Sequence, residues 1–261
     1  MQYENLSVTF AGQVATVTLN RPDVRNAFNE AMIAELTAAF EALDGRDDVR
    51  AVVLAANGKA FCAGADLNWM KKMAGFSDEE NRADALRLAN MLSAIYRCGK
   101  PVIAKVSGDA YAGGMGLVCA CDIVVAVDTA RFCLSEARLG LIPATIAPYV
   151  IRALGEQASR RYFTTAEQFD CATALRLGLV SEAVAADQLD ATVQQIADTL
   201  CANGPHAVRE CKRLVQDVAG RPLDAGLIED TAVRIARVRA GAEGREGVAS
   251  FLEKRTPGWR N

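Results

Sequence analysis

The chain has 261 residues, of which 51% are hydrophobic and 23% charged, and its formal net charge is −3 at pH 7. This length and composition are typical of a globular protein with a sizeable core. The slight negative charge, with Lys and Arg dispersed along the chain, gives no electrostatic reason to expect nucleic acid or an anionic membrane as a partner.

The cysteines and the start of the chain indicate a compartment. Eight cysteines lie mostly in apolar runs and show no metal-ligand spacing, so we expect small buried side chains in a reducing compartment and no metal site. Residues 1–4 lack a basic region followed by an apolar stretch, and no apolar run reaches the ~18 residues of a membrane span. We therefore expect a cytoplasmic protein without a membrane partner.

The first part of the chain changes from strands to alternating strands and helices. Residues 3–20 alternate apolar and polar residues around Ala11–Gln13, which predicts a β-hairpin. An apolar stripe predicts a helix over 29–44. The continuous apolar run Val49–Ala56 is typical of a strand that is covered on both faces.

Strand and helix continue to alternate as far as about residue 185. The further elements expected there are a helix that contains Leu86–Ile95, a strand at Pro101–Val106, a helix at 114–121 and a strand at Asp122–Val127. This alternation predicts an α/β fold with largely parallel sheets. Beyond residue 185 the pattern predicts only helices, near 187–203, 205–219, 224–240 and 244–255.

The last two predicted helices carry apolar residues without an obvious core of their own. These residues are Leu227, Ile228, Val233, Ile235, Val238, Val248, Phe251 and Leu252. Such surplus apolar faces pack either against another subunit or back onto the same chain, and periodicity alone leaves both possibilities open.

Two glycine-rich segments, Phe61–Asp66 and Gly108–Gly116, each lie between an apolar strand and a helix. Glycine and alanine leave main-chain N–H groups uncovered, and the N–H groups at a helix start are unpaired and lie at the positive end of the helix dipole. Two such loops brought together can hold one oxygen atom that becomes negative during a reaction, which is the role of an oxyanion hole.

Three other functional interpretations fit the sequence poorly. Gly114–Cys119 resembles a dinucleotide-binding fingerprint, but Cys119 replaces the third glycine and no acid follows in the expected context. The chain has no P-loop motif. A serine hydrolase needs an activating histidine, and the single histidine, His206, is expected on the surface.

Glu136 is the candidate acid–base group. It lies in Phe132–Pro143, where most neighbours are apolar or small, so partial desolvation would raise its pKa towards a useful range. The sequence equally allows an exposed glutamate or one that is paired with Arg138.

Several ordered motifs together resemble the enoyl-CoA hydratase/isomerase (crotonase) superfamily. They are Leu19–Pro22, Arg25–Ala27, Phe61–Asp66, Gly108–Gly116, Ala120–Asp122, Ser135–Gly140 with Pro143, and Phe251–Arg255. The resemblance implies a crotonase-type spiral of β-β-α units over residues 1–200, which holds the acyl-CoA site. It also implies a C-terminal helical oligomerisation region over residues 201–261, which forms a homotrimer or a hexamer built as a dimer of trimers.

The resemblance also implies an acyl-CoA thioester substrate and its site. The N–H groups of Ala65 and Gly113 would bind the thioester oxygen, and Glu136 would be the acid/base. The residues that match the CoA-contacting positions are Arg25, Ala27, Ala63, Asp66, Leu67 and, from the tail, Phe251 and Lys254. No separate cofactor is implied, because coenzyme A is part of the substrate.

The sequence departs from the family pattern at two places that bear on the reaction and the substrate. Gly116 stands where typical hydratases carry a further catalytic glutamate, and Pro143–Pro148 replaces a glycine-rich turn. A single glutamate suits either hydration or enoyl-CoA isomerisation, and a non-catalytic acyl-CoA-binding protein is a third possibility. The motifs are most similar to those of bacterial 3-methylglutaconyl-CoA hydratases, whose substrate has a distal carboxylate. We expect Gly116 to belong to the substrate pocket and to leave room for that carboxylate without repelling it.

Overall fold

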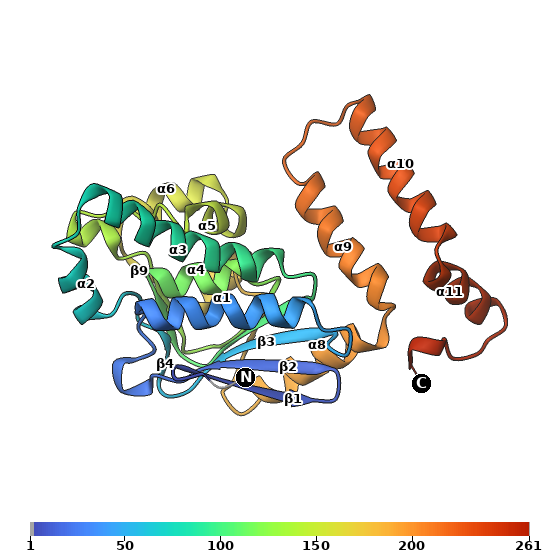
Figure 1. Cartoon of the computed structure of the whole chain (residues 1–261), viewed down its shortest axis with the longest axis horizontal. Helices are drawn as coiled ribbons and strands as arrows, with labels where there is room; N and C mark the ends of the chain where they lie inside the picture. Colours follow the sequence, from blue (N-terminus) through green and yellow to red (C-terminus); the bar gives the residue numbers. More distant parts are fainter. Residues whose placement is uncertain (1–2, 261) are drawn as a thin grey trace.

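A computed structural model describes residues 3–260. Residues 1 and 2, which belong to the start of the chain where no leader was expected, lie outside the described residues. Residue 261, the last of the predicted 201–261 region, lies outside them as well. Two sheets and the helices around them form the body of the molecule, and three long helices extend away from it (Figure 1).

The larger sheet has six strands and contains the N-terminal hairpin. Its order is β1 (Leu6–Ala11), β2 (Val14–Leu19), β3 (Ala51–Ala56), β5 (Val102–Val106), β7 (Ile123–Val127) and β10 (Glu182–Val184). The pair β1–β2 is antiparallel, and every other neighbouring pair is parallel. The predicted hairpin and the largely parallel sheet are confirmed.

A smaller sheet has four strands. Its order is β4 (Ala60–Cys62), β6 (Asp109–Tyr111), β8 (Arg131–Cys133) and β9 (Gln168–Asp170). The pairs β4–β6 and β6–β8 are parallel, whereas β8–β9 is antiparallel. Because parallel strands end at the same edge of a sheet, the loops that follow β4, β6 and β8 lie next to one another.

Consecutive strands alternate between the two sheets, and this alternation repeats along the chain. The pairs β3/β4, β5/β6 and β7/β8 each place the first strand in the larger sheet and the second in the smaller one, and helices follow each pair. This repetition is the β-β-α spiral that the resemblance implies, so the expected fold class is confirmed.

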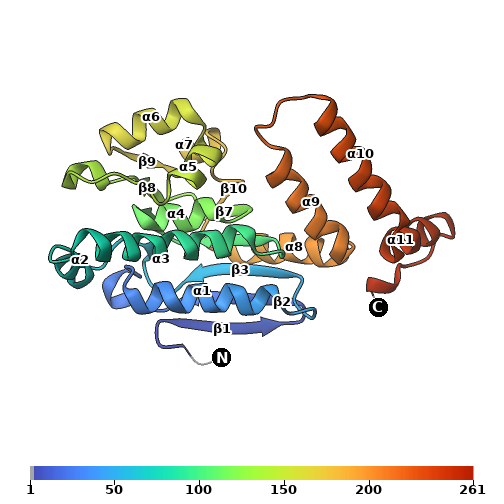
Figure 2. The same ribbon diagram turned by 45° about the horizontal axis from the view of Figure 1, so that its top comes forward.

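Helices surround the two sheets. They are α1 (Glu30–Asp44), α2 (Leu67–Met73), α3 (Asp78–Arg97), α4 (Gly113–Ala120), α5 (Ala147–Leu154), α6 (Glu156–Thr165), α7 (Cys171–Arg176) and α8 (Leu189–Ala202), with short 3-10 helices at Pro22–Val24, Glu136–Leu139 and Gly258–Arg260. Helices α1 and α3 run side by side, and α8 packs against β3, β5 and β7 (Figure 2). Successive residues of β3 are buried, as expected for a strand that is covered on both faces.

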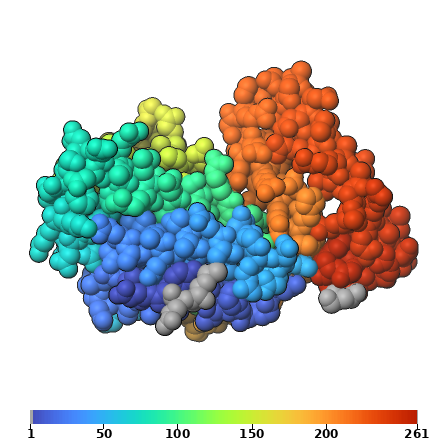
Figure 3. Space-filling view, viewed as in Figure 1, coloured from blue at the N-terminus to red at the C-terminus, as the bar shows by residue number. Residues whose placement is uncertain are grey.

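The remaining helices, α9 (Pro205–Val218), α10 (Ala225–Ala240) and α11 (Ala242–Leu252), lie apart from the sheets. A deep notch separates α9 and α10 from the body in the space-filling view (Figure 3). Leu227 is buried, but Val233 and Phe251 are 54% and 81% exposed. The tail therefore does not bury its apolar faces on its own body, and packing against another subunit stays a prediction. The predicted boundary at residue 200 falls in the last turn of α8 and also stays a prediction.

One largely buried ion pair fastens α9 to the body. The Lys212 Nζ donates to Asp122 Oδ2 at 2.7 Å and to the Lys100 carbonyl oxygen at 3.1 Å. Asp122 Oδ2 also accepts the Val102 N–H at 2.7 Å. Burial raises the pKa of Asp122, and the nearby Lys212 ammonium opposes this rise. Losing the ammonium would leave a poorly solvated carboxylate without its cation.

Lys212→Met should therefore destabilise the protein by about 2–3 kcal/mol, since removal of one partner leaves a buried charge uncompensated. Urea denaturation measures this difference. The matched control is Lys59→Met, which removes an exposed lysine and should change the free energy of unfolding by less than about 0.5 kcal/mol. Equal effects of the two substitutions would contradict a structural role for the Lys212–Asp122 pair.

Candidate active site

The two glycine-rich loops touch each other. One follows β4 and the other follows β6, and the pairing of these strands brings the loops together. Gly64 has φ +93°, and a Cβ on it would lie 3.0 Å from the Ala112 Cβ and 3.8 Å from the Gly113 nitrogen. Only glycine fits this left-handed position and this close approach.

Each loop presents one unused main-chain donor. Within residues 3–260, the N–H groups of Ala65 and Gly113 donate to no protein acceptor, and both residues are partly exposed. Gly113 is the first residue of α4, so its N–H lies at the positive end of the helix dipole. Two free N–H groups on touching loops are suited to hold a negative oxygen.

Phe28 fixes both loops, and sequence reasoning missed it. Its N–H donates to the Gly64 carbonyl oxygen at 2.7 Å, and its own carbonyl oxygen accepts the Asp66 N–H at 2.7 Å. Its ring is buried, and a Cβ on Gly113 would lie 2.6 Å from Phe28 Cε2. The sequence signal that could have found Phe28 is its place directly after the family motif Arg25–Ala27.

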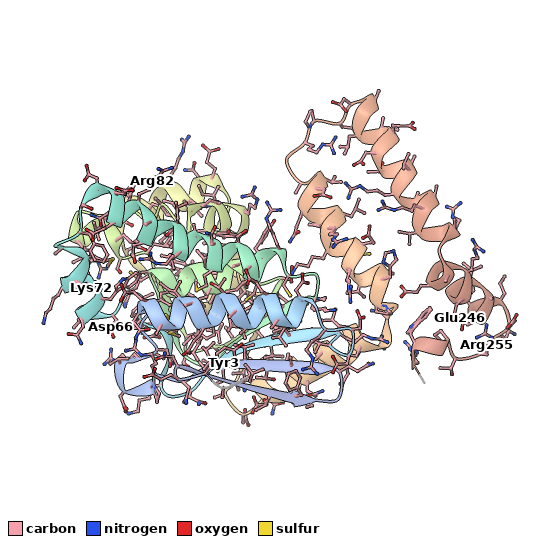
Figure 4. All side chains as sticks on the ribbon, viewed as in Figure 1. Tyr3, Asp66, Lys72, Arg82, Glu246 and Arg255 are labelled. Carbon is pink, nitrogen blue, oxygen red and sulfur yellow. The ribbon has the colours of Figure 1, made fainter. Side chains whose placement is uncertain are left out.

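The first loop is also held by an ion pair between Arg21 and Asp66. Arg21 donates to Asp66 Oδ2 at 3.0 Å and to the Ala27 carbonyl oxygen at 2.5 Å. Asp66 caps α2 by accepting the N–H groups of Asn68 and Trp69, and it lies at the start of that helix in Figure 4. Burial raises the pKa of Asp66, but the hydrogen bonds from Asn68 and Arg21 outweigh it and leave the pKa below its usual range.

Both oxygens of the Asp66 carboxylate thus accept hydrogen bonds from the protein itself. The side chain is also buried, and the contact with CoA that the resemblance implies for Asp66 stays a prediction. Arg21 belongs to the family motif Leu19–Pro22, and no sequence pattern pointed to its pairing with Asp66.

The second loop is tied to the strand that leads to Glu136. Ala112 has φ +47° and ψ −117°, a strained conformation for a residue with a side chain. Its N–H donates to the Cys133 carbonyl oxygen, at the end of β8, at 2.8 Å. Since Glu136 follows Cys133 by three residues, its place in the chain puts it at the edge of the sheet where the two loops meet.

Glu136 begins the short 3-10 helix Glu136–Leu139 and is half-buried. Its Oε2 atom is buried and has no hydrogen-bond partner within the described residues. Burial raises the pKa of Glu136, which favours the protonated form. Arg138 forms no ion pair with Glu136 and donates to the Ala166 carbonyl oxygen at 2.6 Å. The alternatives of a fully exposed glutamate and of a Glu136–Arg138 pair are therefore wrong.

The pocket expected at Gly116 is closed. Gly116 is buried, and a Cβ on it would overlap Ile146 Cγ2 and lie 3.4 Å from Leu92 Cδ2. Ile146 itself is buried and belongs to Pro143–Pro148, the segment that departs from the family's glycine-rich turn. The apolar Ile146 side chain therefore fills the space that was expected beside Gly116. The expected place of Gly116 in the substrate pocket stays a prediction.

The other predicted CoA residues lie in two separate places. Arg25 and Leu67 are exposed, and Ala27 and Ala63 are near them along the same two segments. Phe251 and Lys254 are exposed at the end of α11, on the opposite side of the molecule from α2 (Figure 1). One chain does not bring this tail to its own loops. The CoA-binding roles stay predictions.

Other kinds of site find little support in the described chain. Within residues 3–260, no group of three or more His, Cys, Asp or Glu side chains is placed to hold a metal ion. No helix in the same range is long and apolar enough to cross a membrane. His206 is exposed, as predicted. A cavity of about 890 Å³ separates α9 from the body and includes Lys212 and Asp122, but it does not include the glycine-rich loops or Glu136.

Comparison with known proteins identifies the family. The model of the enoyl-CoA hydratase/isomerase family matches residues 9–261. The crystal structure of an enoyl-CoA hydratase from Shewanella pealeana is 44% identical, with a TM-score of 0.96 over 99% of this chain and 97% of that one. The crystal structure of an enoyl-CoA hydratase from Mycobacterium smegmatis is 37% identical, with a TM-score of 0.93 over 99% of this chain and 100% of that one.

A curated relative supports the same assignment. The enoyl-CoA hydratase ACTT6 of Alternaria alternata is 34% identical over 241 residues, which cover 90% of this chain and 77% of the relative. Because the family model and these relatives each cover most of the chain, the protein belongs to the enoyl-CoA hydratase/isomerase family.

Proposed function

We propose that the protein is an enoyl-CoA hydratase, which adds water across the α,β-double bond of an acyl-CoA thioester. The observation that carries this proposal is the pair of free N–H groups, at Ala65 and Gly113, on the sheet edge that leads to the partly desolvated Glu136. The names of the similar enoyl-CoA hydratases support the same reaction.

In the proposed reaction the two N–H groups hold the thioester oxygen. Glu136 takes a proton from water as the water oxygen bonds to the β-carbon, and the double-bond electrons move to the thioester oxygen to give an enolate. The same carboxyl group then returns the proton to the α-carbon, and the thioester carbonyl re-forms. The N–H groups act at the stage of highest negative charge, where one such donor is worth on the order of 10²–10³ in rate.

We infer that the substrate is branched or carboxylated, with 3-methylglutaconyl-CoA as the first candidate. The support is the similarity of motifs to hydratases of that substrate. Arg138, which is exposed two residues after Glu136, is our candidate for binding the distal carboxylate.

One observation favours a second candidate function, enoyl-CoA isomerisation. Ile146 fills the space beside the position where typical hydratases carry another glutamate, so this site offers a single carboxyl group there. A single base can move a proton between two carbons of the acyl chain while the same two N–H groups hold the enolate.

We also propose that the protein is a cytoplasmic homotrimer or a dimer of trimers. The exposed apolar side chains of α10 and α11 support association through the tail. In such an assembly Phe251 and Lys254 would contact the CoA of a neighbouring subunit. The free cysteines, most of them buried, are compatible with a reducing compartment.

A panel of enoyl-CoA thioesters in ¹⁸O-labelled water tests the reaction and the substrate together. We expect mass spectrometry to show one solvent oxygen in the product, with a kcat/KM for 3-methylglutaconyl-CoA at least about tenfold above that for crotonyl-CoA, the effect of one good polar contact. Equal rates would reject the substrate assignment. An isomerised product without solvent oxygen would reject hydration in favour of the isomerase.

Glu136→Gln tests the acid/base role. The amide cannot take or return the proton, so kcat should fall by on the order of 10²–10⁴-fold while affinity for the acyl-CoA stays nearly unchanged. Glu229→Gln, at an exposed position on α10, is the matched control and should leave kcat unchanged. Unchanged turnover in Glu136→Gln would remove Glu136 from the mechanism, and binding without turnover in the wild-type protein would favour the non-catalytic alternative.

The raised pKa of Glu136 predicts a pH-dependent stability difference. A carboxyl whose pKa is higher in the folded than in the unfolded state favours folding below its unfolded pKa, and this contribution is lost as pH rises through the folded pKa. Glu136→Gln, which stays neutral, should therefore melt at a higher temperature than the wild type at pH 8. The difference should shrink as pH falls towards 4, and calorimetry that shows a constant difference would contradict the pKa shift.

A further inference from the structure

A small cavity lies where α9 begins, away from the glycine-rich loops. Its volume of about 10 Å³ leaves room for one particle of about the size of a water molecule. Its lining consists of Val49, Arg50, Lys100, Pro101, Leu200, Pro205, Val208 and Arg209. Every ionisable side chain in this lining is a cation, and the other side chains are apolar.

Lys100 is the unusual member of this lining. The residue is only 1% exposed, and its Nζ atom is buried without a hydrogen-bond partner among the described residues. Burial lowers the pKa of Lys100, and the nearby Arg209 guanidinium lowers it further. A buried ammonium without a partner is costly, so the charged form needs a bound group that accepts its hydrogen bonds.

Arg50 also lines this cavity. Its guanidinium donates to the carbonyl oxygens of Cys201, Asn203 and Trp259 at 3.2, 3.3 and 3.1 Å. These acceptors are neutral, so they satisfy donors of Arg50 without supplying a negative charge.

The nearby acids compensate the cavity only weakly. The Asp47 carboxylate lies 3.5 Å from Arg209, but its side chain is 99% exposed, so water screens its charge. The Asp44 carboxylate also attracts the Lys100 ammonium, but the two groups form no hydrogen bond. Asp44 Oδ1 instead accepts the Gly99 N–H at 2.6 Å. Three cations around a space of this size therefore favour an anion over a neutral water molecule.

We propose that this cavity binds one chloride ion, held by Lys100 Nζ between the guanidinium groups of Arg50 and Arg209. The ion joins three parts of the chain: the residue before β3, the turn before β5 and the first part of α9. Chloride thus stabilises the attachment of the C-terminal helices to the body. This site is independent of the proposed hydratase activity.

Thermal unfolding of the full chain tests the proposal. Sodium gluconate, whose anion is too large for the cavity, is replaced by sodium chloride at constant ionic strength. We expect Tm to rise by about 2–4 °C for the wild type, which is the shift expected when the chloride concentration is several times the Kd of the site. Lys100→Met should show no chloride response, whereas Lys59→Met, at an exposed lysine, should respond like the wild type.

Bromide provides a second measurement that needs no variant. Anomalous diffraction from wild-type crystals soaked in bromide should show a peak among Lys100, Arg50 and Arg209, even if Lys100→Met fails to fold. A cavity without a bromide peak, or an equal Tm in chloride and gluconate, would overturn the proposal and identify the occupant as water. A chloride response that persists in a folded Lys100→Met protein would overturn it as well.

Discussion

The parallel pairing of β4, β6 and β8 is the constraint on which the candidate site depends. Each strand has only three residues, yet their register brings the first glycine-rich loop, the second loop and the segment before Glu136 to one edge of the small sheet. The larger sheet and its helices hold these short strands in place. The two N–H donors and the carboxyl group are therefore properties of the strand arrangement, and each loop alone would be an ordinary strand-to-helix turn.

Side chains far apart in the sequence then fix the loops. Phe28 bonds to the first loop and presses its ring against Gly113 of the second, while Arg21 holds Asp66. Such support matters because donors aimed at a developing charge act only when they are already in place. Phe28 and Arg21 thus hold the two segments that carry the free N–H groups of Ala65 and Gly113.

The sequence predicted the parts of this arrangement that are local or repeated. Apolar runs predicted the buried strands, and ordered motifs predicted the spiral, whereas the acid/base role of Glu136 stays a prediction. It could not predict the contact between Phe28 and Gly113, because 85 residues separate them and neither carries a periodic signal. For the same reason the absence of a side chain at Gly116 suggested open space, whereas Ile146, 30 residues later, fills it. The burial of Lys100 also depends on α9, which follows it by about 100 residues.

The fit of Ile146 against Gly116 also limits how this protein can evolve. Any side chain at position 116, even the methyl group of alanine, would overlap Ile146, so a glutamate could enter only if Ile146 moved or became smaller. Shrinking Ile146 first would open a void in a buried apolar contact and reduce stability. A carboxyl group at position 116 therefore requires a change around residue 146 as well, and substitution of one residue at a time would tend to preserve the glycine.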